Sequence, residues 1–203
     1  MINKVLFLFV FLMLLASCKN QTASKKTVSS KKTVSSKKET PLSRNELVAS
    51  IKQMEDSIMS LVNSPKPSDK ILSLSNIELI NRLVSFYQAF PKDPYSAECL
   101  FKIHEKYSEL DAPKKALDYG DTLLVNFPNF PNRDFLLESM CATYEVDIVP
   151  TDTSSLRKYY TLLLKEATVT PEKRKEIQMR LKYIGMTLFE YAEFKNKQTS
   201  NVN

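Results

Sequence analysis

The sequence is poor in the residues on which most catalytic and metal sites depend. Its 203 residues include one histidine, two glycines, three cysteines and no tryptophan. A single histidine, His104, excludes sites that need two or more imidazoles, and two glycines leave little material for phosphate-binding loops. The sequence contains no P-loop, GxGxxG or HExxH motif. We therefore expect a non-enzymatic protein without a metal or a cofactor.

The chemically active side chains that remain do not favour catalysis. Cys99 precedes His104 by five residues, which places the two side chains about 140° apart around a helix. Glu105 and Glu109 face the same side of one helix, whereas catalytic carboxylate pairs face each other across a cleft. His104 is expected in the core or lining a groove. Cys99 and Cys141 are expected as buried thiols, and their spacing leaves open whether they pair.

Positive charge is concentrated near the N-terminus. The chain has a net charge of +6, and residues 19–40 alone carry seven lysines and one glutamate. Residues 41–203 carry 21 basic and 22 acidic side chains, so this larger part is nearly neutral. A nucleic-acid-binding domain has a basic face, and we expect no nucleic-acid partner.

An apolar run near the N-terminus ends at a cysteine. Val5 to Ala16 is an uninterrupted apolar stretch of 12 residues, too short to cross a bilayer, which requires about 20 residues. The basic Lys4 before it and the small Ser17 after it fit a secretory signal with its cleavage site. Two simpler interpretations stay open. The stretch could be an ordinary signal peptide in which the cysteine has no role, or a short buried helix with an unrelated cysteine.

The residues Leu15-Ala16-Ser17-Cys18 resemble the lipobox of bacterial lipoproteins. The resemblance implies that residues 1–17 are a signal peptide and that Cys18 becomes the acylated first residue, anchored in the bilayer by its acyl chains. In Bacteroidota-type lipoproteins, which the chain resembles, an acidic run after the cysteine favours surface export. Here that position is basic, which favours a protein that faces the periplasm. By analogy with the enterobacterial sorting pattern, Lys19 rather than aspartate after Cys18 favours the outer membrane of the cell envelope. The membrane and the leaflet stay open.

The segment that follows has the composition of a linker. Residues 19–40 contain the hexapeptide KKTVSS twice and no glycine or aromatic residue. Such a composition buries too little apolar surface to offset the entropy of ordering, so we predict a disordered tether over 18–40. Its lysines either contact anionic headgroups or simply keep the linker soluble.

Residues 41–195 have helical apolar spacing throughout, and 196–203 are expected as a disordered tail. Capping boxes at Ser43-x-x-Glu46 and Ser75-x-x-Glu78 predict the first two helices. Further helix starts are predicted at or beside Asp93-Pro94, Asp111, Asn132, Ser154 and Thr170-Pro171. The first helix is expected over 43–62, the sixth from about 154 to 167, and the seventh as one long helix that includes Tyr191. The inward residues predicted for the second helix are Ile77, Ile80, Leu83, Val84 and Tyr87.

The helical segments repeat a spacing that resembles tetratricopeptide repeats. The residues that carry the resemblance are Leu100, Ile103, His104, Tyr107, Ala116, Gly120, Leu123 and Pro128. Similar helices start near 94, 132 and 171, at spacings of 38 and 39 residues rather than about 34. The resemblance implies an all-α fold of stacked helical hairpins with about seven helices, like degenerate repeat lipoproteins that assist outer-membrane assembly. An irregular helical bundle is the alternative.

An anchored helical repeat is suited to binding. We therefore expect a non-catalytic protein–protein interaction scaffold in the envelope, in outer-membrane assembly or maintenance. The alternative is a lipoprotein that binds a glycan or peptidoglycan fragment. The candidate partner-binding positions, each of which could instead be merely solvated, are Lys102, His104, Lys106, Ser139 and Lys182. The partner and the oligomeric state stay open, as does whether helix 43–62 caps the repeats or binds a partner.

Overall fold

The described part of the chain consists of helices joined by short loops. A computed structural model describes residues 42–66 and 68–200, which belong to one compact unit, Pro41–Asn203. The helices are α1 (Arg44–Val62), α2 (Asp69–Ala89), α3 (Pro94–Glu109), α4 (Pro113–Asn126), α5 (Arg133–Val146), α6 (Thr153–Leu163), α7 (Pro171–Lys182) and α8 (Leu188–Ser200). The predicted signal peptide, Cys18 and the tether lie outside the described residues. So do the last three residues of the predicted tail.

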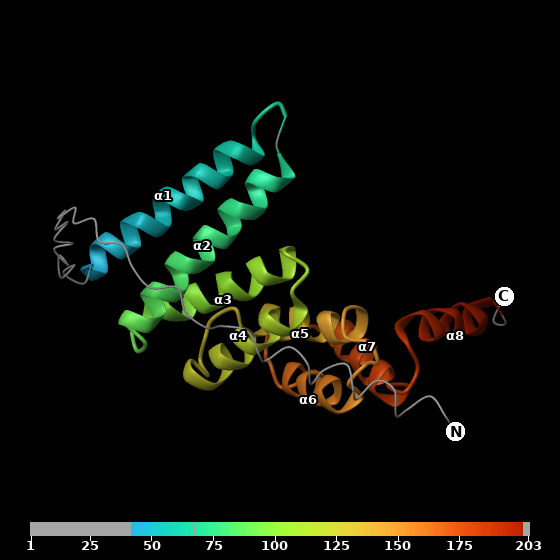
Figure 1. Cartoon of the computed structure of the whole chain (residues 1–203). Coiled ribbons are helices and arrows are strands. Elements are labelled where there is room, and N and C mark those ends of the chain that lie inside the picture. Colours follow the sequence, from blue (N-terminus) through green and yellow to red (C-terminus); the bar gives the residue numbers. More distant parts are fainter. Residues whose placement is uncertain (1–41, 67, 201–203) are drawn as a thin grey trace, which may run out of the picture. The chain divides into compact units, whose positions relative to one another are not determined.

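Each helix from α1 to α6 packs on the helix that follows it in the chain (Figure 1). The closest packing is within α1–α2, α2–α3, α3–α4 and α5–α6. The residues that the structure describes contain no β-strand. The predicted fold class, an all-α stack of helical hairpins, is thereby confirmed, and the described part of the chain has eight helices rather than about seven. Within these residues, no helix combines the length and apolarity needed to cross a membrane.

Three of the predicted helix starts are confirmed with their capping contacts. The Ser43 hydroxyl accepts the backbone N–H of Glu46, and the Glu46 carboxylate accepts the backbone N–H of Ser43 at 2.8 Å, a complete capping box. Asp93 caps α3, whose first residue is Pro94, and accepts the backbone N–H of Tyr95 at 2.9 Å. Thr170 caps α7 in the same way. These side chains satisfy N–H groups that have no partner inside the helix.

The predicted start of the second helix is wrong. α2 begins at Asp69 with Ser68 as its N-cap, so Ser75 and Glu78 lie within the helix. The inward face also differs, because Ile77 is exposed while Leu79 and Phe86 are buried. α2 packs against both α1 and α3, and two neighbours require a wider buried face than one apolar stripe indicates.

The predicted long seventh helix is two helices. α7 ends at Lys182 and α8 begins at Leu188. The break is stabilised at both ends: Arg180 donates to the carbonyls of Tyr183 and Met186 at 2.7 and 2.9 Å, and Thr187 forms a capping box with Glu190.

The fourth helix also starts later than predicted, at Pro113, because Asp111 adopts a left-handed backbone conformation with φ 54°.

The core consists of two hydrophobic clusters that meet at α3. Cys99 and Ile103 belong to the cluster formed with α1 and α2, whereas Ala97 and Leu100 belong to the cluster that extends to α7. The described residues of both clusters lie within Pro41–Asn203, which is one compact unit, and a compact unit that contains its own core can fold alone. Aromatic residues are part of both clusters, with Phe130 in one and Phe86 in the other. The ring pairs Phe86–Phe90 and Phe101–Phe130 each lie 5.3 Å apart between centroids.

Gly120 lies where three helices approach closely. A Cβ atom added at this position on α4 would lie 2.9 Å from the sulfur of Met140 on α5 and 3.3 Å from Nδ1 of His104 on α3. Both neighbours are fully buried, so neither has free space into which to move. The absence of a side chain at Gly120 therefore has a direct steric cause.

Candidate functional site

The five predicted partner-binding residues do not form one surface. Lys102 forms an ion pair with Glu55 on α1 at 2.7 Å, and Lys106 forms one with Glu109 on its own helix at 2.8 Å. Lys182 is exposed at the end of α7, with its ammonium 5.4 Å from the centre of the Tyr183 ring.

His104 is fully buried and contacts Ser139, the last of the five. Its Nε2 lies 2.8 Å from the Ser139 hydroxyl, and its Nδ1 lies 2.8 Å from the Ala116 carbonyl oxygen. Since a carbonyl can only accept, Nδ1 carries the proton and Nε2 accepts from Ser139. Burial lowers the pKa of His104, outweighing the opposite effect of the hydrogen bond to Ala116. A neutral His104 with no exposed surface replaces the expectation of a groove-lining residue that contacts a partner.

A serine hydrogen-bonded to a histidine is also the pair that activates serine nucleophiles. Here a backbone carbonyl orients the imidazole, and Ser139 is itself half-buried. His104 has an exposed fraction of 0%, so a substrate cannot contact it as the protein stands. The pair links α3, α4 and α5, and we assign it a packing role.

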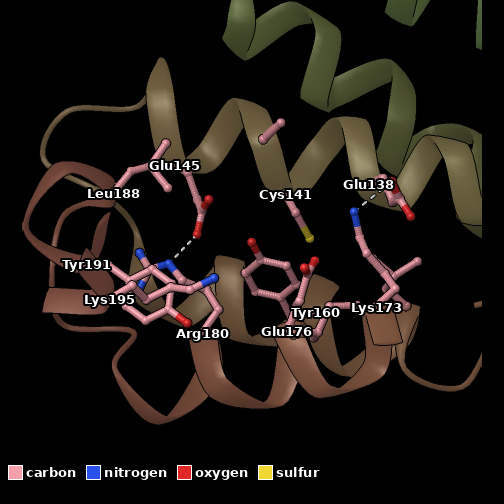
Figure 2. A pocket seen from close by; sticks show the side chains of 13 residues that line it. Glu138, Cys141, Glu145, Tyr160, Lys173, Glu176, Arg180, Leu188, Tyr191 and Lys195 are labelled. Atoms are coloured by element: carbon pink, nitrogen blue, oxygen red, sulfur yellow. Dashed lines mark hydrogen bonds and ion pairs between the residues drawn. The ribbon is translucent and has the colours of Figure 1, made fainter. Parts of the chain in front are cut away.

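A polar cavity of about 360 Å³ lies among α5, α6, α7 and α8 (Figure 2). Its charged lining consists of three carboxylates and three cations, Glu138, Glu145, Glu176, Lys173, Arg180 and Lys195. Lys173 forms an ion pair with Glu138 at 3.3 Å, and the ring of Tyr160 lies between this pair and Arg180–Glu145 in Figure 2. Two of the three carboxylates are therefore neutralised by ion pairs within the cavity.

Arg180 and Glu145 form the most buried ion pair of the described residues. Their atoms lie 2.6 Å apart, and only 6% and 8% of the two side chains are exposed. The same guanidinium donates to two carbonyls of the α7–α8 connection and lies 5.2 Å from the centre of the Tyr191 ring. Arg180 thus joins α5, the end of α7 and α8.

The thiol of Cys141 and the hydroxyl of Tyr160 are held in their neutral forms. Burial raises the pKa of the Cys141 thiol and, together with the nearby Glu145, the pKa of Tyr160. Burial also raises the pKa of Cys99 to about 12. A thiol is nucleophilic only when it ionises, so neither cysteine is activated. Both thiols are free and lie in separate core clusters.

A second cavity, the C-terminal groove, is mainly apolar. It measures about 850 Å³ and lies between the α5–α6 loop and the segment from Ile184 to Ala192. Four of its lining residues are among the most exposed apolar side chains of the described chain: Val149 at 88%, Phe189 at 72%, Val146 at 60% and Leu188 at 42%. This groove was not predicted from the sequence. Val146 and Val149, in and just before the loop that contains Pro150, were a signal that this loop makes apolar contacts.

Among residues 42–66 and 68–200, no three histidine, cysteine or carboxylate side chains lie close enough together to hold a metal ion. Comparisons of the chain with protein-family models, with curated proteins and with solved structures gave no match. The lipobox and the repeat pattern therefore stay resemblances, and any function must be argued from the residues and their geometry.

Proposed function

We propose that this chain is a lipid-anchored envelope protein whose helical domain docks a second protein without catalysing a reaction. The observation that carries the proposal is the exposure of large apolar side chains at both ends of the helical array. One set lies where α1 meets α2 and comprises Met59, Val62, Ile71, Leu74 and Ile77, and the other lines the C-terminal groove. Apolar side chains that gather on a protein surface mark sites of interaction.

The state of the polar groups is consistent with a docking role. His104, the only histidine of the chain, is buried and hydrogen-bonded through both ring nitrogens, and the buried thiols are held un-ionised. The ion pairs of the polar cavity join one helix to another. These groups stabilise the array, and its surface is left to make contacts with a partner.

Anchoring through Cys18 would place the domain in the envelope. The support is the lipobox resemblance of Leu15 to Cys18 and the basic residues after it, which favour the outer membrane and its periplasmic side. Acyl chains on Cys18 would hold the domain at the bilayer, where its partner would be another envelope protein or peptide.

Crosslinking in intact cells tests this proposal. We expect the wild-type protein to be crosslinked to a specific envelope protein, and the purified partner to bind residues 41–203 directly. Cys18→Ala should lower the crosslinked yield because the protein leaves the membrane, while leaving the direct binding unchanged. Failure to recover any protein that binds residues 41–203 directly would contradict the docking role.

The alternative, binding of a glycan or peptidoglycan fragment, is favoured by one observation. The polar cavity combines carboxylates, cations and the tyrosines Tyr160 and Tyr191, groups that can bind sugar hydroxyls and the charged ends of short peptides. Retention on purified sacculi measures this directly. Specific retention of the wild type, lost in Glu176→Ala and kept in the control Lys182→Ala, would favour the alternative over protein docking.

A further inference from the structure

The C-terminal groove is formed by segments that the rest of the array does not cover. Val146 and Val149 lie on one side, in and before the α5–α6 loop, and Leu188 and Phe189 lie on the other, in the first turn of α8. Phe189 and Val149 are more exposed than almost every other apolar residue of the described chain. Exposing several large apolar side chains to water in one concave site is unfavourable, because apolar surface is more stable when it is buried.

α8 lies at the end of the array (Figure 1). Of its residues whose burial the structure describes, only Tyr191 is buried. Tyr191 faces Arg180 and the polar cavity, whereas Phe189 and Ala192 line the C-terminal groove. In a stack of helical hairpins each apolar face is covered by the next helix, and among the described residues no further helix follows α8.

The residues beside the groove are acidic. Asp147 follows Val146 in the loop, and Glu193 follows Ala192 on α8, one turn after Phe189. Both are exposed, and neither has an ion-pair partner among the described residues. Asp152 and Glu190 add two further carboxylates as helix caps at the same end.

Two cations at this end of the array do not line the groove. Arg180 is buried against Glu145, and Lys195 lines the polar cavity rather than the groove. The groove thus combines an apolar floor with the exposed carboxylates of Asp147 and Glu193 beside it, and the exposed Lys197 lies one turn after Glu193 on α8. The complement of the groove is a segment with an apolar face flanked by lysine or arginine side chains.

We propose that the C-terminal groove binds a basic amphipathic helix of the partner protein, in the position that a further helix of the array would take. Its apolar face contacts Val149 and Phe189, and its lysines or arginines face Asp147 and Glu193. This inference rests on the proposed docking function and names the surface and the chemistry of the partner. A helix fits better than a strand, because the residues described offer helices and loops and no sheet edge.

The test uses residues 41–203, which contain both core clusters, and two fluorescent peptides of about 18 residues, a length that spans five helical turns. Both peptides carry leucine and phenylalanine at positions i, i+3, i+4 and i+7. One has lysines beside this face and the other has glutamates. Fluorescence anisotropy measures the affinity at low and high salt, and hydrogen exchange locates the peptide. Circular dichroism confirms that each variant is folded.

The proposal predicts that the basic peptide binds at least tenfold more tightly than the acidic one and that salt weakens its binding. It predicts protection of the α5–α6 loop and the first turn of α8. Phe189→Glu should weaken binding at least tenfold, and the double variant Asp147→Lys, Glu193→Lys should reverse the preference between the peptides. The control Phe135→Glu alters a similarly exposed phenylalanine (65%) outside the groove and should bind as the wild type does.

Equal binding of both peptides, or equal losses in Phe189→Glu and Phe135→Glu, would overturn the proposal. So would self-association of the wild type that Phe189→Glu abolishes in analytical ultracentrifugation, because a second copy would then occupy the groove. If these tests fail while an envelope partner still binds residues 41–203, only the groove assignment is lost. If no partner binds at all, the proposed function is lost as well.

Discussion

The hydroxyl of Ser139 on α5 donates a hydrogen bond to Nε2 of His104 on α3, and the two atoms lie 2.8 Å apart. Through its other nitrogen, His104 donates to the Ala116 carbonyl on α4. One imidazole thus joins the hairpin α3–α4 to the first helix of the next hairpin. Because buried polar groups are stabilising only when they are paired, this contact fixes how the two hairpins stack.

Replacing His104 should destabilise the domain. His104→Ala removes two hydrogen bonds and leaves a cavity between three helices, so we expect the free energy of unfolding to fall by about 2–4 kcal/mol. Ser139→Ala removes one hydrogen bond and should cost about 1 kcal/mol. Urea denaturation of residues 41–203 measures both changes in the free energy of unfolding. The exposed Lys182→Ala is the control, and its change should be near zero. A loss of less than about 0.5 kcal/mol for His104→Ala would show that the imidazole does not stabilise the stack.

Stability should also depend on pH through His104. Its pKa is lowered in the folded protein from the ordinary value of 6.5, so the unfolded chain binds a proton that the folded domain does not. The stability that the domain gains from holding His104 neutral is therefore fully present above pH 6.5. It is lost as the pH falls toward the lower pKa of His104 in the folded protein. We expect the unfolding free energy to decrease as the pH falls below about 6.5. His104→Gln should remove this slope, and an unchanged slope would mean that other groups cause it.

The two glycines should respond in opposite directions to alanine. Gly120→Ala places a Cβ against Met140 and His104, and overpacking of this kind costs about 1–3 kcal/mol, more than the gain of up to about 1 kcal/mol in helix propensity. Gly185→Ala meets no atom within 4 Å and should be neutral or stabilising by up to about 1 kcal/mol. Thermal unfolding of both variants is the measurement. Equal effects of the two substitutions would contradict the close approach at Gly120.

Arg180 should control the order of the α7–α8 connection. Arg180→Met leaves Glu145 buried without its partner, which costs about 3–5 kcal/mol, and frees the carbonyls of Tyr183 and Met186. Hydrogen exchange should therefore become faster in residues 183–187 and in α8 but not in α1 and α2. Arg180→Lys should not restore protection, because an ammonium lacks the planar fork that reaches three acceptors. Full protection in Arg180→Lys would show that charge alone is sufficient.

Much of the fold could be predicted because its signals are local. Ser43 and Asp93 are each followed by residues that define a helix start, and the structure confirms both. Ser75-x-x-Glu78 had an equally good local pattern, but the structure uses Ser68. A capping box shows that a helix can start at that residue. It does not show which of two possible starts is selected by the packing of the helix. Thr187-x-x-Glu190 was the same signal at α8, and the continuous apolar spacing through Ile184 and Tyr191 concealed it.

The contacts between distant residues could not be predicted. His104 and Ser139 are 35 residues apart, and their contact was not predicted: His104 was expected in the core or lining a groove, and Ser139 at a binding surface or merely solvated. The same holds for Arg180 and Glu145, whose pairing depends on how α5 and α7 pack. The C-terminal groove depends on the break between α7 and α8, which the repeat spacing did not indicate.

The most direct test of the central claim is to measure the intact mass and membrane partitioning of the full chain beside Cys18→Ala, both expressed in a bacterium that processes lipoproteins. The account predicts a wild-type protein that begins at Cys18, carries the added mass of acyl chains and partitions with membranes. Cys18→Ala should lack that mass and lose the membrane attachment. If the two proteins have the same unmodified mass and the same distribution, the chain is not anchored through Cys18, and the proposed role in the envelope is wrong.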